Sequence, residues 1–288
     1  MEYLESVRAF LAPPPLSPIF QAGSQLDGWN EDICLILFFL FVLGAVDVCV
    51  VHPFLNPKCR YFALHLIANS IAAVAALPDL VRGLTTDPLY VFSGPSDTMV
   101  ANSAVCAIHL YHCVVFKLRW DDIFHHLVFV FLLCGLAIPF KQISGVANNF
   151  GLFFLSGLPG GIDYFMLVCV CQRLMKKATQ KHYYALLNVY IRGPSIVIYS
   201  FIGWQTMYHG TYGPPLPALI TVVVLCFFNG QYYLHQAVAT TTLFFYKQKL
   251  IMEGVLLPTK ECDTNRDASS SATFRKKPVH KEDDSCYR

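Results

Sequence analysis

Seven long apolar stretches dominate this 288-residue sequence. Each is close to the roughly 20 residues that a helix needs to cross the hydrocarbon core of a bilayer. Their apolar runs are continuous and do not alternate, which favours helices over the strands of a membrane barrel. The sequence therefore predicts an all-α polytopic membrane protein with seven transmembrane helices, at residues 33–51, 61–82, 98–117, 121–139, 146–171, 187–208 and 217–245.

Composition supports the same fold class. Hydrophobic residues make up 55% of the chain and charged residues only 14%, well below the roughly 25% of soluble domains. A soluble protein of this size needs far more polar surface. The net charge of +2 gives no sign of nucleic-acid binding. We therefore expect membrane lipids as partners and no nucleic acid.

The basic residues predict the orientation of the spans. If the N-terminus lies outside, 17 of the 21 lysines and arginines fall in inner segments and three in outer segments. Because cytosolic loops carry the excess of Lys and Arg, we expect a lumenal or extracellular N-terminus and a cytosolic C-terminus. The predicted units are an N-terminal segment (1–32), a first transmembrane helix (33–51), a transmembrane bundle (60–246) and a tail (247–288) whose polar, serine-rich sequence predicts disorder.

Polar side chains inside the predicted spans are the candidate functional residues, because such groups are costly in a membrane. Most fall at a similar depth, in the cytosolic half of the spans: His65, Asn69, His109, His112, His125, His126, Asp163, Arg192, Asn229 and His235. An isolated histidine is also readily explained as an interhelical hydrogen-bond partner. Arg192, near the predicted inner end of its span, either lines a cavity or extends to the lipid headgroups.

The adjacent histidines 125 and 126 are the strongest candidates. Neighbouring residues of a helix point about 100° apart, so one ring can face a cavity while the other contacts a neighbouring helix. Asp163 must be paired or protonated if it is buried, and a histidine or Arg192 is the expected partner. The preceding Gly157–Gly161 segment, with Pro159, predicts a kinked or unwound helix. Such a break either lines a watery cavity or lets two helices approach closely.

The histidine spacing does not predict a metal site. Membrane di-iron oxygenases need about eight histidines in several HxxH boxes, whereas this chain has one such box, from His109 to His112. Zinc-type cysteine pairs, a P-loop and a dinucleotide-binding motif are absent from the sequence. We therefore expect neither a metal nor a bound cofactor.

Four segments resemble the TLC family, the membrane domain shared by ceramide synthases and several lipid-handling proteins. They are RYFALHLIANSIAAVAALPDL (60–80), WDDIFHH (120–126), NNFGLFFLSGLPGGIDYFML (148–167) and FFNGQYYLHQ (227–236). The resemblance implies a six-helix bundle around a cytosol-facing cavity, with one preceding helix, in the endoplasmic reticulum or another endomembrane. It also implies acyl transfer by the histidine pair. The synthase pattern of a following Thr and two Asp is replaced here by Leu127, Val128 and Phe129.

Three functions are compatible with these features. The first is lipid homeostasis or metabolism through binding of a lipid or acyl chain, without chemistry. The second is an acyltransferase of the ceramide-synthase type, in which His125, His126 and Asp163 are catalytic, acyl-CoA is a co-substrate and Arg192 binds a phosphate or carboxylate. The third is a seven-helix receptor or transporter, although the third span ends in VVFKLRW and has no DRY-like motif. The sequence leaves binding and catalysis open.

Overall fold

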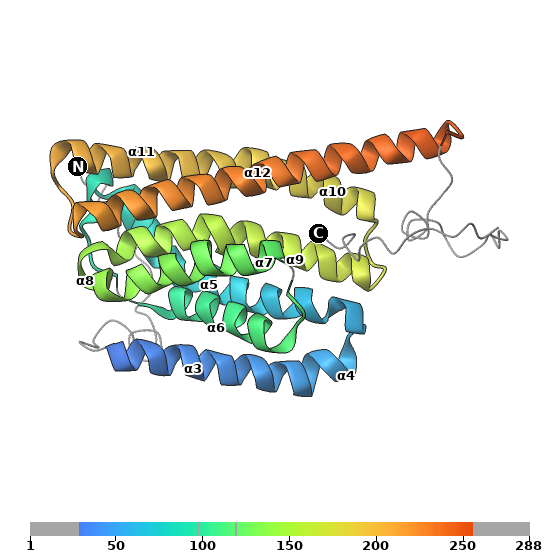
Figure 1. The fold of residues 1–288 in the computed structure, drawn as a ribbon, viewed down its shortest axis with the longest axis horizontal. Coiled ribbons are helices and arrows are strands. Elements are labelled where there is room, and N and C mark those ends of the chain that lie inside the picture. Colours follow the sequence, from blue (N-terminus) through green and yellow to red (C-terminus); the bar gives the residue numbers. More distant parts are fainter. Residues whose placement is uncertain (1–28, 97, 119, 256–288) are drawn as a thin grey trace, which may run out of the picture.

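The computed structural model describes residues 29–96, 98–118 and 120–255, and this part of the chain is helical and contains no strand (Figure 1). Short 3₁₀- or π-helical segments are labelled η. The first elements are α3 (Trp29–Val46), η1 (Asp47–Val51), α4 (His52–Phe54), η2 (Pro57–Cys59), α5 (Arg60–Thr85), η3 (Pro88–Phe92) and α6 (Val100–Val115). The later ones are α7 (Trp120–His125), η4 (His126–Phe131), α8 (Leu132–Leu152), η5 (Phe153–Gly157), α9 (Leu158–Cys171), α10 (Lys177–Leu187), η6 (Asn188–Arg192), α11 (Gly193–His209) and α12 (Leu216–Met252). The all-α prediction is confirmed.

Six helical segments of the described chain are long and apolar enough to cross a membrane: Asp32–Phe54, Pro57–Thr85, Asp122–Lys141, Ile143–Cys171, Lys177–His209 and Leu216–Met252. The remaining predicted span coincides with α6, which is only 16 residues long. This helix packs against α3, α5 and α8, and most of its residues are buried. A helix enclosed by protein need not match the bilayer thickness, because its ends meet protein groups rather than lipid.

The outward faces of the helices are apolar. Large hydrophobic side chains are exposed on α3, α11 and α12, for example Phe41, Trp204 and Val224. Soluble monomers rarely expose extended apolar patches of this kind. Together with the span lengths, these faces indicate an integral membrane protein.

The helices run back and forth along the long axis of the bundle (Figure 1). One end holds α4, the start of α5 and the end of α12, together with Lys58, Arg173, Lys177 and Lys247; we call it the basic end. The opposite end holds the turn between α11 and α12. The chain reverses there within α8 as well, at Ser144, whose φ of −157° is not helical.

Two helices extend beyond their predicted limits. The predicted span 187–208 begins at Lys177 in the structure, because α10, η6 and α11 form one continuous segment. Helix α12 runs to Met252, so residues 247–252 continue the last helix rather than belonging to the tail. The rest of the predicted tail from residue 256, and the N-terminal segment up to residue 28, lie outside the described residues.

Small residues set the distance between α5 and the η5–α9 segment. A Cβ atom placed on Gly157 would lie 3.0 Å from the Cα atom of Ala73. The neighbouring backbone forms the π-helix η5, followed by Pro159 near the start of α9. The distortion thus lies in the turn that ends at Gly157, whereas the rest of the predicted Gly157–Gly161 break is regular helix in α9, and the glycine permits close packing against α5.

We expect Gly157→Ala to destabilise the bundle by about 1–3 kcal/mol, the usual cost of an added methyl group in a packed interior. Gly135→Ala is the matched control, because no atom lies within 4 Å of the Cβ that it would add. Thermal unfolding of the purified variants in detergent measures the difference. Equal melting temperatures for the two variants would contradict the close approach.

Ion pairs with buried carboxylates anchor the first helical segment, α3 and η1, at both of its ends. Toward the basic end, the fully buried Asp47 accepts hydrogen bonds from Arg60 Nε at 2.7 Å and from the Tyr111 hydroxyl at 2.5 Å. Toward the opposite end, Lys141 Nζ lies 2.7 Å from Asp32 Oδ2, and both residues are buried. These contacts join the first helix to α5, α6 and α8.

Candidate functional site

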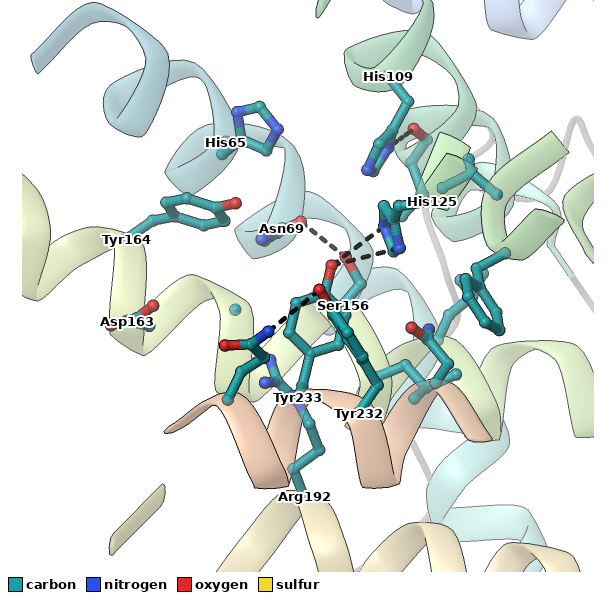
Figure 2. Close-up of a pocket in the computed structure, with 18 of the residues that line it drawn as sticks. His65, Asn69, His109, His125, Ser156, Asp163, Tyr164, Arg192, Tyr232 and Tyr233 are labelled. Carbon is teal, nitrogen blue, oxygen red and sulfur yellow. Dashed lines mark hydrogen bonds between the residues drawn. The ribbon is translucent and has the colours of Figure 1, made fainter. Parts of the chain in front are cut away.

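A cavity of about 1900 Å³ lies between the helices of the described chain. At the basic end it is bordered by charged side chains, among them Lys58, Lys177 and Lys247. A layer of histidine, tyrosine and amide groups follows (Figure 2). Beyond this layer, apolar side chains of η4, α8 and α12 form what we call the apolar chamber, which includes Leu133, Ala137, Ala218, Val222 and Leu225. The interval from Asn229 to Ala218 on α12 gives the chamber a depth of about 16 Å.

Five histidines from three parts of the chain form one ring-to-ring cluster, the imidazole cluster. It contains His65 of α5, His109 and His112 of α6, and the pair His125 and His126 where α7 passes into η4. The centre of the His126 ring lies 4.9 Å from that of His109 and 5.0 Å from that of His112. His65 lies 5.5 Å from His112 and 5.8 Å from His109. The one HxxH spacing therefore places two rings on the same face of α6.

Hydrogen bonds fix the orientation of two of these rings. His65 Nδ1 lies 2.9 Å from the Tyr61 carbonyl oxygen, and His109 Nδ1 lies 2.7 Å from that of Val105. Since a carbonyl oxygen only accepts, each Nδ1 must carry the proton and donate. The Nε2 atom of a neutral ring is then a hydrogen-bond acceptor and a base. Both histidines line the cavity.

The adjacent histidines contact different helices, although both line the cavity. His126 is buried and packs against α6, where Cys113 Sγ lies 3.6 Å from its Nδ1. His125 faces α12, and its two ring nitrogens each lie 3.3 Å from the Tyr233 hydroxyl (Figure 2). The Tyr233 ring is also 5.2 Å from the guanidinium carbon of Arg192. Tyr233 thus connects the imidazole cluster with Arg192.

Arg192 lies deep in the bundle, not at the surface. Its helical segment begins at Lys177, so Arg192 is about 22 Å along the axis from that residue. The side chain is buried, with 6% of its surface exposed, and lines the cavity. Arg192 Nη1 donates to Asn188 Oδ1 at 2.5 Å, and Asn188 Nδ2 donates to the Tyr184 carbonyl at 2.8 Å. The alternative that Arg192 extends to the headgroups at the end of its helix is therefore wrong.

Asp163 has a hydrogen-bond partner that the sequence does not predict. Gln180 Nε2 donates to Asp163 Oδ1 at 2.8 Å, and Arg192, one of the expected partners, interacts with the carboxylate only electrostatically. The difference arises because α10 begins at Lys177 and carries Gln180 alongside α9. Asp163 lines the cavity, but in the described part of the chain its hydrogen bond goes to Gln180 and not to His125 or His126.

Three of the cavity-lining polar residues lie in π-helical turns. These residues are His126 in η4, Ser156 in η5 and Arg192 in η6. Ser156 Oγ donates to Asn69 Oδ1 at 2.9 Å and so joins η5 to α5. A π-helical turn carries an extra residue, turns the following side chains and is frequent at functional sites. The three turns thus direct polar groups from separate helices toward one space.

The cavity includes most of the predicted site residues: His65, Asn69, His109, His125, His126, Asp163, Arg192 and Asn229. His112 belongs to the imidazole cluster but does not line the cavity. His235 is exposed on α12 and lies outside it. Among the described residues, no group of three or more His, Cys, Asp or Glu side chains is arranged to hold a metal ion.

The sequence analysis did not identify several residues of the site. Tyr233, Gln180 and Ser156 line the cavity and bond to predicted residues. Gln180, Tyr184, Asn188 and Arg192 follow one another at intervals of four residues, the spacing of one helical face. From that spacing, the helix could have been predicted to start near residue 177 and to place Gln180 on the same face as Arg192.

Comparison with protein-family models, with curated proteins and with solved structures finds no match for this chain.

Proposed function

We propose that the protein binds a membrane lipid or acyl chain in this cavity and acts in lipid homeostasis or metabolism. The observation that carries the proposal is the continuity of the cavity, which joins a layer of polar side chains to the apolar chamber. An amphiphile is the ligand that fits both parts, because its chain buries apolar surface while its head meets hydrogen-bonding groups. The TLC-like segments support the same proposal. In it, the basic end faces the cytosol of an endomembrane such as the endoplasmic reticulum.

Filling the apolar chamber tests lipid binding. Val222 lines the chamber from α12, so Val222→Trp places a large ring where the chain of the ligand would lie. We expect lipid binding at least about tenfold weaker, a loss of about 1.4 kcal/mol. Binding is measured on the purified protein by titration with an oleoyl lipid and by the lipids that remain bound after purification.

Val224→Trp is the matched control. Val224 is two residues away on the same helix, is exposed and does not line the cavity. This variant should bind lipid as the wild type does. Equal binding by both tryptophan variants and the wild type would place the lipid elsewhere and remove the support for the cavity.

Acyl transfer from acyl-CoA is a second candidate, favoured by the imidazole cluster. His109 Nε2 is an acceptor at the cavity wall, and His125 lies beside the Tyr233 hydroxyl. In this reaction a histidine takes a proton from the hydroxyl or amine of the acceptor lipid. The resulting nucleophile attacks the thioester carbonyl, and the thiol of CoA leaves with a proton.

A further inference from the structure

The guanidinium of Arg192 has no hydrogen-bonded carboxylate partner among the described residues. Within the described part of the chain, no carboxylate forms an ion pair with this side chain, and its Nε atom has no acceptor. The guanidinium donates a hydrogen bond to the neutral Asn188 oxygen and lies over the face of the Tyr233 ring. The carboxylate of Asp163 interacts with Arg192 electrostatically, but its hydrogen bond comes from Gln180. A buried guanidinium normally requires an anion, because desolvating an unpaired charge is costly.

Asn229 adds a second unsatisfied atom to the same cavity. It is buried, it lies one helical turn from Tyr233 on α12, and its Oδ1 atom has no hydrogen-bond donor. Residues four apart share one helical face, so Asn229 lies on the side of α12 on which Tyr233 meets Arg192. The site thus offers a ligand the charged N–H donor of Arg192 and, from the same side of α12, the acceptor oxygen of Asn229.

The charges along the cavity wall favour an anion as well. Among the described residues, the lining side chains include two carboxylates, Asp122 and Asp163, and seven cations: Lys58, Arg173, Lys176, Lys177, Lys181, Arg192 and Lys247. A cavity with low-dielectric walls concentrates such a field. The general excess of lysines at the cytosolic ends of membrane helices explains the basic residues at the mouth of the cavity. It does not explain Arg192, which lies about 22 Å along its helix from Lys177.

We propose that the cavity binds an acidic lipid, with its oxyanion on Arg192 and its chain in the apolar chamber. A hydroxyl or N–H group beside the oxyanion donates to Asn229 Oδ1. This inference rests on the proposed lipid-binding function and narrows it to one class of ligand. Guanidinium groups bind phosphate and carboxylate oxygens through charge-assisted hydrogen bonds. Both oxyanions are therefore tested.

The test uses three probes that share one oleoyl chain. Oleoyl lysophosphatidic acid carries a phosphate, oleate carries a carboxylate, and monooleoylglycerol is neutral. Affinities are measured on the full-length protein in a non-ionic detergent, with inorganic phosphate as the probe without a chain. We expect at least one acidic probe to bind about tenfold or more tightly than monooleoylglycerol. Arg192→Gln should remove this preference while binding of monooleoylglycerol changes little.

Lys249→Gln is the matched control, because Lys249 is an exposed cation on α12 that does not line the cavity. It should keep the preference for the acidic probes. Whether phosphate or carboxylate binds more tightly then identifies the oxyanion. If Arg192→Gln does not fold, the relative affinities of the three probes for the wild type and for Arg192→Lys still test whether the cavity selects an acidic lipid.

Two results would overturn the inference in distinguishable ways. Equal affinity of the wild type for all three oleoyl probes would show that the lipid cavity exists but does not select an anion. Inorganic phosphate competing as strongly as the acidic lipids would show a binding site for free phosphate. Failure of every oleoyl probe to bind would instead reject the proposed function itself.

Discussion

Replacing Arg60 by glutamine is expected to lower the free energy of unfolding by about 3–5 kcal/mol, the cost of leaving a buried charge without its partner. Asp47 is fully buried and takes hydrogen bonds from both Arg60 and Tyr111. Without Arg60, only the neutral tyrosine would remain to compensate the carboxylate. Unfolding of the purified protein in mixed detergent micelles measures the change.

The opposite substitution should cost less. Asp47→Asn leaves Arg60, whose side chain is 30% exposed and lies near the basic end, free to reach water or headgroups. The exposed pair Lys249 and Glu253 is the control, and Lys249→Gln should change the stability by at most about 1 kcal/mol. If Arg60→Gln costs no more than this control, the ion pair does not hold α3 to the bundle.

The positions of the spans follow from hydropathy because a bilayer selects for long apolar helices. The depth of the polar residues follows as well, since a helix rises by a fixed length per residue. The histidine layer could therefore be predicted, and eight of the ten candidate residues line one cavity. What a single sequence does not specify is the lateral packing of one helix against another, which small residues and interhelical hydrogen bonds determine.

The two unexpected pairings both depend on lateral packing. Asp163 meets Gln180 because α10 starts ten residues before the predicted span and lies beside α9. Tyr233 meets His125 because α12 packs against η4, which directly follows His125. His235, two residues further along α12, is exposed instead. Depth alone does not distinguish Tyr233 from His235, since only the rotation of the helix about its axis separates them.

Removing the histidine pair is the prediction with the largest expected effect on activity. If the imidazole cluster transfers protons during acyl transfer, the double substitution His125→Ala, His126→Ala should reduce turnover by about 10²–10⁴-fold, the usual contribution of a general base. Cells that express the wild-type protein should show a shift in one lipid class, and cells with the double variant should not. The expression levels must match, and unfolding of the purified variant must confirm that it folds.

His235→Ala is the control within the same set of candidates. Its ring is exposed on α12 and lies outside the cavity, so its loss should leave the lipid shift intact. An equal shift from the double variant and the wild type would contradict catalysis by the pair. The imidazole cluster would then be a packing and hydrogen-bonding layer between α5, α6 and η4, and the function would reside in binding by the cavity. Absence of any shift, even with the wild-type protein, would count against a role in lipid metabolism.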